Sequence, residues 1–305
     1  MAKYLLIESR DPFENNVVAR QYDLAVNLVR EGNEVTLFLV QSDEDARRWT
    51  AMGARAEAVR VTGNLKYDVR APKQNRVAEL VRDAAAGRPI LVAGSTVDKK
   101  NSNTLSEDEI VIQAWEGALR RDLGVMLVLA PRHPERFGEV KSVAMEFRLQ
   151  NMSEVAAAKE GNPPFAKDAK DGPPDWPVEI VLLDTIGDLA AVYGVADVAF
   201  VGGSLVPKGG HNPLEPARFG VPVVMGPSYE NFRDVVERML SADGILIVRN
   251  RAEFEAALID LVKNRQRADA IGQRGRAVFE AQAGATARTV QALVTLLQER
   301  SAAMR

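Results

Sequence analysis

The sequence predicts an α/β fold with a parallel, doubly wound sheet from about residue 88 onward. Short apolar runs, helical patterns between most of them, and small or polar residues directly after the runs together favour this class. The expected strands lie at 89–93, 126–130, 179–183, 197–201, 222–225 and 245–248. Ser106 and Glu109 form a capping-box pattern ahead of an apolar helical face. The tail from 252 to 305 is expected to be helical throughout.

Residues 1–87 predict a smaller α/β segment. Strands expected at 4–7 and 34–40, with a helix over 20–30 between them, make one βαβ unit. A helix over 42–52 and a strand over 58–62 should follow, then a linker at 70–75 and a helix over about 76–86. Farther along, residues 159–177 are rich in Pro, Gly, Lys and Asp. We expect that stretch to be a surface excursion.

The bulk composition excludes several classes of function. Of the 305 residues, 46% are hydrophobic and 27% are charged, which is typical of a soluble globular protein. The absence of cysteine excludes disulfides, thiolate zinc sites and cysteine nucleophiles. A formal net charge of -3 gives no indication of nucleic-acid binding. We find no metal-ligand spacing, and no apolar run reaches the ~20 residues of a membrane-spanning helix.

The loop after the strand at 197–201 is the most informative segment. Ligands of open parallel sheets bind beyond the carboxyl ends of the strands. Four glycines within nine residues would let backbone amides approach an anion, and a helix beginning just beyond them would favour phosphate. Glycines alone also make turns, but here the loop adds further polar residues, which favours ligand binding. Its candidate residues are Gly203, Ser204, Lys208, Gly209, Gly210, His211, Asn212 and Glu215.

Other expected strands also end in polar loops. These contain Ser95 and Thr96 after the first strand, Arg132 and His133 after the second, and Thr185 and Gly187 after the third. Arg132 suits a phosphate, although an ordinary surface arginine is an equal alternative. Glu215 could accept hydrogen bonds from a ribose diol, but the helix dipole alone also favours a carboxylate there. We assign neither histidine a proton-transfer role.

The segment from Phe200 to Pro216 resembles the signature of the 3-deoxy-D-manno-octulosonic acid (Kdo) transferase family. Shorter matches follow the family order at 61–68, 93–96, 129–137 and 184–189, and again from Gly226 to Phe232. The resemblance covers about residues 41–300. It implies a GT-B fold, with two Rossmann-like domains around a cleft. The C-terminal domain would bind the donor CMP-Kdo, and the N-terminal domain would bind a lipid A precursor as acceptor.

The resemblance also implies roles for the candidate residues. Arg132 would meet the CMP phosphate and Glu215 the cytidine ribose, while Ser204 and the loop from Gly209 to Asn212 would line the donor site. Such enzymes are inverting and use neither a metal nor another cofactor. They act at the cytoplasmic face of the inner membrane, so a cytoplasmic location is implied. Peripheral membrane association is left open, and we expect no nucleic-acid partner and no transmembrane helix in this chain.

Some positions depart from the family pattern. Val97 stands where the family has histidine, and Asp188 stands where it usually has glutamate. The family's acceptor domain is about as long as its donor domain and supplies a catalytic glutamate, whereas only about 40 residues precede the match here. We therefore expect a complete C-terminal Rossmann-like donor domain with a truncated or replaced N-terminal α/β domain. The catalytic residue remains unassigned.

The first 40 residues suggest a different origin for the N-terminus. Residues 3–13 and 21–40 resemble the start of small DsrE-like sulfur-relay proteins, with a seam near Gln41. The expected organisation is a DsrE-like βαβ segment at 1–41, a remnant of the N-terminal GT-B domain with a linker at 42–87, a nucleotide-sugar-binding domain at 88–284, and a C-terminal helix at 285–305.

Four functions are compatible with these features. The first is Kdo transfer from CMP-Kdo to a lipid A precursor in lipopolysaccharide biosynthesis. The second is a CMP-sugar-binding module without catalysis of its own, because the acceptor domain and its glutamate would be missing. The third, sulfur relay, generally works through cysteine persulfides and ranks last. The long signature argues against the fourth, a GT-B enzyme with another nucleotide sugar. We predict a Kdo transferase by lineage and donor specificity.

Overall fold

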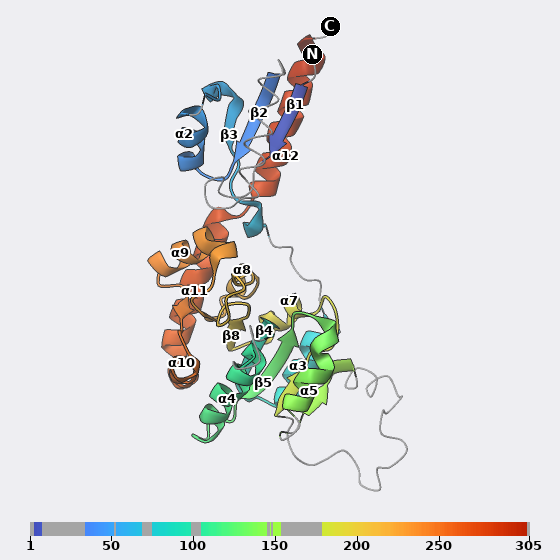
Figure 1. Ribbon diagram of the computed structural model, residues 1–305, viewed down its shortest axis with the longest axis vertical. Coiled ribbons are helices and arrows are strands. Elements are labelled where there is room, and N and C mark those ends of the chain that lie inside the picture. The colour runs from blue at the N-terminus through green and yellow to red at the C-terminus, as the bar shows by residue number, and fades with distance from the viewer. Residues whose placement is uncertain are drawn as a thin grey trace. The chain divides into compact units, whose positions relative to one another are not determined.

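The computed structural model describes residues 3–7, 34–51, 53–68, 75–98, 105–144, 147, 149–153 and 179–303. The chain divides into two compact units. The first comprises Met1–Arg70 and Ala281–Arg305, and the second comprises Ala71–Glu280. Figure 1 labels the helices and strands of both.

The second unit is built on a seven-stranded sheet in the order β10-β9-β8-β4-β5-β7-β6. All of its neighbouring strands pair in parallel, which confirms the predicted fold class. Each of the six expected strands is present, and the structure adds the three-residue strand β6. The strands are β4 (Ile90–Thr96), β5 (Met126–Pro131), β6 (Leu149–Asn151), β7 (Ile180–Leu182), β8 (Val198–Val201), β9 (Val223–Met225) and β10 (Leu246–Ile247).

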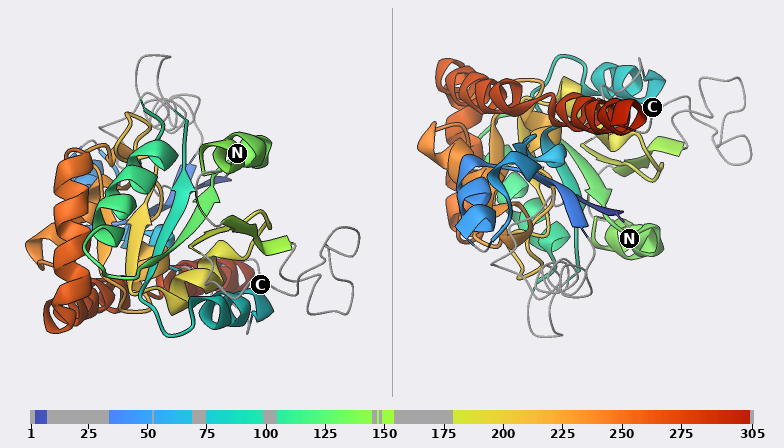
Figure 2. Two further views of the ribbon diagram at one scale, coloured as in Figure 1. Left: turned by 90° about the horizontal axis from the view of Figure 1, so that it is seen from below. Right: turned by 90° about the horizontal axis from the view of Figure 1, so that it is seen from above.

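Helices cover both faces of this sheet (Figure 2). Because side chains alternate along a strand, Leu91 packs with Trp115 and Phe254 on one face. Val92 packs with Val81 on the other face. The helices of this unit are α3 (Arg76–Ala85), α4 (Glu107–Leu119), α5 (Phe137–Val143), α7 (Leu189–Val192), α8 (Leu214–Ala217), α9 (Arg233–Ser241), α10 (Arg251–Lys263) and α11 (Arg265–Gln282).

The strand order creates a topological switch point between β4 and β8. From β4 the chain first builds the side of the sheet that starts at β5, and then returns to β8 on the other side of β4. The loops after these two strands therefore lie side by side, and the amide of Gly202 donates to the carbonyl of Gly94 at 2.9 Å. This is the edge at which sheets of this kind bind ligands.

The predicted capping box at the start of α4 is present. The Ser106 hydroxyl accepts a hydrogen bond from the amide of Glu109 at 3.3 Å. The Glu109 carboxylate in turn accepts from the amide of Ser106 at 2.6 Å. This reciprocal cap fixes where the helix begins. It thereby places Glu107 and Asp108 in the first turn, where both side chains are buried.

The first unit contains a three-stranded parallel sheet in the order β1-β2-β3. Its small core includes Phe38 and Trp49, whose ring centroids lie 5.0 Å apart. The expected strands near 4–7 and 34–40 are both present. The helix expected over 20–30, the linker residues 70–74 and the excursion at 159–177 lie outside the described residues. The elements are β1 (Lys3–Ile7), β2 (Glu34–Val40), β3 (Val59–Val61), α2 (Asp43–Ala51) and α12 (Ala285–Ala303).

The family-matching segment at 61–68 holds the C-terminal helix within this first unit. The Asp68 carboxylate accepts hydrogen bonds from the amides of Gly284 and Thr286, at the start of α12. Arg288 donates to the carbonyl of Thr62 at 2.8 Å. The helix α12 therefore belongs with the N-terminal strands. None of the helices among the described residues combines the length and the apolar character that a membrane crossing needs.

The helix α3 lies in a different unit from the one expected from the sequence. It was expected to belong with the N-terminal remnant at 42–87, but it falls in the second unit. Its apolar residues Leu80, Val81 and Ala85 are buried in the core beneath the seven-stranded sheet. The second unit therefore begins before residue 88.

Candidate functional site

The carboxylate of Glu107 fills the space between the carboxyl ends of β4 and β8. Its Oε1 atom accepts hydrogen bonds from the amides of Ser204 and Leu205, at 2.9 and 2.8 Å. Its Oε2 atom accepts from the amides of Gly203 and Val97, at 2.6 and 3.1 Å. Burial raises the pKa of the Glu107 carboxyl, and the four amides act in the opposite direction. Both carboxyl oxygens face N–H donors, so the O–H of a protonated Glu107 would have no acceptor among these four groups. The geometry therefore suits the ionised carboxylate.

The glycine-rich loop was expected to present its amides to a ligand anion. In the structure Gly203 donates to Glu107 instead. The amide of Gly209 donates to the Ser228 hydroxyl at 2.9 Å, and that of Gly210 donates to the carbonyl of Gly203 at 2.7 Å. An anion does meet this loop, but it is the protein's own carboxylate. Sequence reasoning missed this function of Glu107, because it treated the residue only as part of a capping pattern.

Two hydroxyl groups predicted to line the site are buried and used internally. Thr96 donates to one oxygen of Asp108 at 2.5 Å, and Arg136 donates to the other oxygen at 2.6 Å. Ser204 donates to the carbonyl of Val201 at 2.6 Å. We call Thr96, Glu107, Asp108, Arg136 and Ser204 the inner cluster.

Ser204 also joins two neighbouring strand ends. Its hydroxyl accepts a hydrogen bond from the amide of Gly226 at 2.8 Å, which ties the loop after β8 to the loop after β9. Gly202 packs so closely on the carbonyl oxygen of Ser95 that an added Cβ would lie 2.4 Å from it. The loop at the switch point is therefore fixed on both sides.

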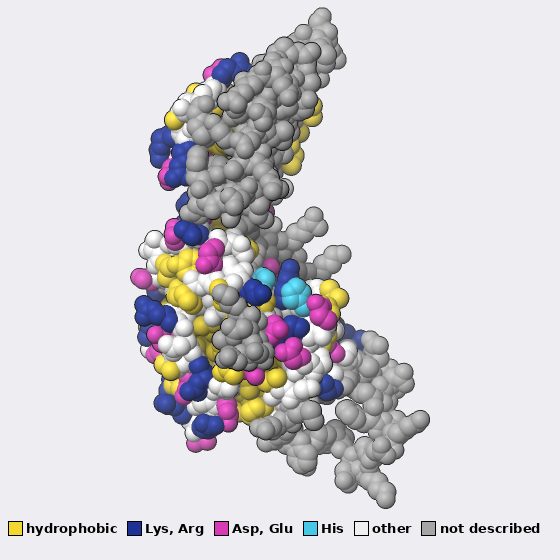
Figure 3. Space-filling view, viewed as in Figure 1, with side chains coloured by type: hydrophobic (Ala, Val, Ile, Leu, Met, Phe, Trp, Pro, Cys, Tyr) yellow, Lys and Arg dark blue, Asp and Glu magenta, His cyan; other side chains and the backbone are white. Residues whose placement is uncertain are grey.

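A second group of side chains at the same edge is more open. Arg132 and His133 follow β5 and are exposed, whereas His211 and Glu215 are half-buried. His211 lies over Gly203, where an added Cβ would come within 2.9 Å of the imidazole. We call Arg132, His133, His211 and Glu215 the outer cluster. Histidine, basic and acidic side chains gather on the face of the molecule shown in Figure 3.

Electrostatic interactions link the members of the outer cluster. Burial, together with the charges of Arg132 and His133, lowers the pKa of His211 to about 4. The His211 imidazole is therefore neutral at pH 7. Burial raises the pKa of Glu215, and the positive charge of Arg132 opposes that shift. Burial and the nearby Glu215 raise the pKa of Tyr193 well above its usual range. The cluster thus combines a permanent cation, a neutral imidazole and a carboxyl group.

The remaining predicted residues surround this edge of the sheet. Ser95 has a left-handed backbone with φ of 57° and is half-buried. Thr185 is half-buried, and its hydroxyl oxygen has no hydrogen-bond partner among the described residues. Gly187 and Lys208 are exposed. The Asn212 side chain accepts from the amide of Leu214 at 3.1 Å, at the start of α8.

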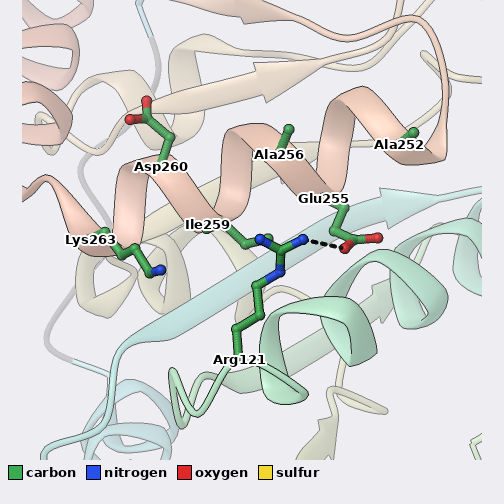
Figure 4. A pocket seen from close by; sticks show the side chains of 7 residues that line it. All are labelled: Arg121, Ala252, Glu255, Ala256, Ile259, Asp260 and Lys263. Atoms are coloured by element: carbon green, nitrogen blue, oxygen red, sulfur yellow. Dashed lines mark ion pairs between the residues drawn. The ribbon is translucent and has the colours of Figure 1, made fainter.

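A separate pocket lies against α10, and its volume is about 540 Å³. Figure 4 shows Arg121 reaching toward Glu255, at 3.9 Å. This pocket has no residue in common with the inner or outer cluster. It is lined by Arg121, Ala252, Glu255, Ala256, Ile259, Asp260 and Lys263. Across the part of the chain that the structure describes, no group of three or more His, Asp or Glu side chains could hold a metal ion.

The parallel sheet and its polar switch-point edge define the second unit as a Rossmann-like domain of the GT-B type. The structure is similar to the C-terminal CMP-Kdo binding domain of WaaA from Acinetobacter baumannii, with a TM-score of 0.53 and 25% identity. That match covers 67% of this chain and 95% of the WaaA domain. A putative UDP-N-acetylglucosamine 2-epimerase from Listeria monocytogenes shares the fold, with a TM-score of 0.56, 16% identity, and coverage of 94% of this chain and 63% of that protein.

The sequence comparisons point to one family. Residues 18–69 match the family model described as 3-deoxy-D-manno-octulosonic-acid transferase (kdotransferase). The transferase of that name from Haemophilus influenzae is 30% identical over 274 residues, which cover 87% of this chain and 58% of the relative. The Bordetella pertussis transferase is 33% identical over 255 residues, covering 84% of this chain and 55% of the relative.

These matches confirm the resemblance to the Kdo transferase family. The chain is homologous to Kdo transferases over most of its own length, and it spans somewhat more than half the length of these two relatives. The family model begins to match at residue 18. The match therefore includes much of the segment that resembled DsrE-like proteins, and it runs across the seam expected near Gln41.

Proposed function

We propose that this chain binds CMP-Kdo at the carboxyl edge of its seven-stranded sheet, as part of an enzyme that transfers Kdo to a lipid A precursor in lipopolysaccharide biosynthesis. The observation that carries this proposal is the similarity to the WaaA domain, which is described as binding CMP-Kdo and is covered over 95% of its length. The open, charged outer cluster lies at the switch point where such a fold binds its ligand.

The outer cluster supplies groups suited to a nucleoside monophosphate. Arg132 presents an exposed, permanent charge to the phosphate and stabilises the negative charge that grows on the departing CMP. Glu215, held half-buried beside it, accepts hydrogen bonds from the ribose diol. His211, neutral near pH 7, can donate or accept one hydrogen bond without repelling Arg132.

The other predicted residues divide into two groups. We propose that Ser95, His133, Thr185, Gly187, Lys208, Gly209, Gly210 and Asn212 line the donor. Gly209 and Gly210 would do so through backbone atoms other than their amides, which donate to Ser228 and Gly203. Thr96, Gly203 and Ser204 are committed to hydrogen bonds with other parts of the chain. We propose that these three residues support the structure of the site and do not contact the donor.

Calorimetric titration with CMP tests donor binding. The wild type should bind CMP, and Glu215→Ala should lower the affinity by about 10- to 100-fold, because it removes charged hydrogen-bond acceptors from the ribose. Glu237→Ala, an exposed position on α9, is the matched control and should leave the affinity unchanged. Equal affinity in wild type and Glu215→Ala would remove Glu215 from the site, and no binding to the wild type would reject the proposal.

The alternative is a module that binds CMP-Kdo without transferring the sugar. Homology to proteins named as transferases, over 87% and 84% of this chain, favours transfer. Incubating the chain with CMP-Kdo and a lipid A precursor should yield a Kdo-modified lipid and free CMP. Tight CMP binding with no modified lipid would instead support the binding module.

The chemistry of the acceptor suggests where the protein works. Because a lipid A precursor is a membrane lipid, we propose that the chain acts on the cytoplasmic side of the inner membrane through peripheral contact. Co-sedimentation with vesicles that contain the lipid A precursor should retain the protein, and vesicles without the precursor serve as the comparison. Protein that stays in the supernatant with both would contradict this part of the proposal.

A further inference from the structure

The position of Glu107 has a consequence for donor choice. In sheets of this type, amides of the loop at the switch point are the groups that bind a ligand phosphate. Here three successive amides of that loop, from Gly203 to Leu205, donate to the Glu107 carboxylate. The side chain is completely buried. A negative charge belonging to the protein therefore occupies a position suited to a phosphate.

We infer that Glu107 is a specificity-determining residue that makes the site favour a donor with one phosphate over one with two. This inference rests on the proposed function. One phosphate binds to Arg132 in the outer cluster, beside the loop. A second phosphate directed at the amides of residues 203–205 would find all three N–H groups already donating and would face the negative Glu107 carboxylate, which disfavours a nucleoside diphosphate.

The surrounding residues prevent Glu107 from withdrawing. Its neighbour Asp108 is fixed by hydrogen bonds from Thr96 and Arg136, both of which are buried. The reciprocal cap between Ser106 and Glu109 holds the same turn of α4. Moving the Glu107 carboxylate would thus require the whole first turn to rearrange. The amides that it covers would also lose their partner.

The nucleotides CMP and CDP, which differ by one phosphate, test this inference in competition and calorimetric titrations. The wild type should bind CMP at least about tenfold more tightly than CDP. In Glu107→Ala the vacated amides become available to the second phosphate, so the preference for CMP should fall by about tenfold or more. The matched control is Glu116→Ala, on the same helix but with a side chain that is 35% exposed to solvent. It should keep the wild-type preference.

Two outcomes would overturn the inference. One is equal binding of CMP and CDP by the wild type, and the other is an unchanged preference in Glu107→Ala. If Glu107→Ala does not fold, Glu107→Gln gives the same comparison at nearly constant side-chain volume. Its preference for CMP should also fall, because the negative charge is gone.

Hydrogen exchange separates this inference from the proposed function. Added formate should enter the space left in Glu107→Ala, accept the hydrogen bonds of the loop, and slow the exchange of the amides of residues 203–205. It should have no effect on the wild type or on Glu116→Ala. Failure of the wild type to bind CMP would reject the proposed function while leaving this readout intact. If formate leaves the amide exchange rates of Glu107→Ala unchanged, the hypothesis that the loop amides form an anion position is rejected.

Discussion

The inner and outer clusters lie at the same edge of one sheet but differ in what their charges contact. In the inner cluster, Asp108 is paired with Arg136 and Glu107 is surrounded by amides. In the outer cluster, Arg132 is exposed and His211 is only half-buried. The first turn of α4 makes the difference, because it inserts two carboxylates at the inner position. Polar residues at strand ends are therefore either paired within the fold or left open, depending on what packs over them.

The largest predicted effect tests whether the inner cluster is structural. Asp108→Ala removes the partner of a buried arginine, so the free energy of unfolding should fall by about 3–5 kcal/mol. Urea unfolding measures the change. Glu116→Ala, which breaks an exposed pair with Arg120, should cost at most about 1 kcal/mol. Similar losses in the two variants would contradict the contrast between the clusters.

The second prediction tests the outer cluster as a ligand site. Arg132→Ala should weaken CMP binding by about 10- to 100-fold, because a charged hydrogen bond to phosphate is lost. Its free energy of unfolding should stay within about 0.5 kcal/mol of the wild type, since the side chain is exposed. Arg120→Ala, at an exposed position directly after α4, is the control for both measurements. A large loss of stability together with normal CMP affinity would show that Arg132 stabilises the fold and does not bind the ligand.

The third prediction concerns pH. The folded His211 has a pKa of about 4, against an ordinary value of 6.5. Between those values the unfolded chain binds more protons, so the free energy of unfolding should fall as the pH is lowered from 6.5 toward 4, by at most about 1.4 kcal/mol per pH unit. Replacement by asparagine, in His211→Asn, should flatten this slope, whereas Glu237→Ala on α9 should keep the wild-type slope. Identical slopes in His211→Asn and the wild type would show that His211 is not the group responsible.

The smallest predicted effect concerns Lys208, which we place outside the outer cluster. Lys208 is exposed, and solvent and salt screen its charge. Lys208→Ala should therefore lower CMP affinity by no more than about threefold at physiological ionic strength. Titration at low and at physiological salt would check this. A loss as large as that of Arg132→Ala would place Lys208 among the principal phosphate contacts.

The fold could be predicted in detail because central parallel strands are almost continuously apolar. The strand expected over 126–130 is observed at Met126–Pro131, and the one expected over 197–201 at Val198–Val201. The strand Leu149–Asn151 was missed, since Gln150 and Asn151 are polar and leave no apolar run. Apolar runs thus carry a local signal that this polar edge strand lacks.

The site could be predicted only in part. The sequence indicated Arg132, His211 and Glu215 through their positions after strands. It could not indicate that Glu107 contacts Gly203, because the two lie 96 residues apart and a glutamate in a helix's first turn is ordinary. For the same reason Thr96 was expected to face a ligand, although its hydroxyl group is buried against Asp108.

A crystal structure of the chain with CMP is the most direct test of the division between the two clusters. The account predicts a phosphate within hydrogen-bond distance of the Arg132 guanidinium and a ribose at Glu215. The Glu107 carboxylate should still accept from the amides of Gly203 and Ser204. A phosphate bound to those amides, with Glu107 displaced, would contradict the account.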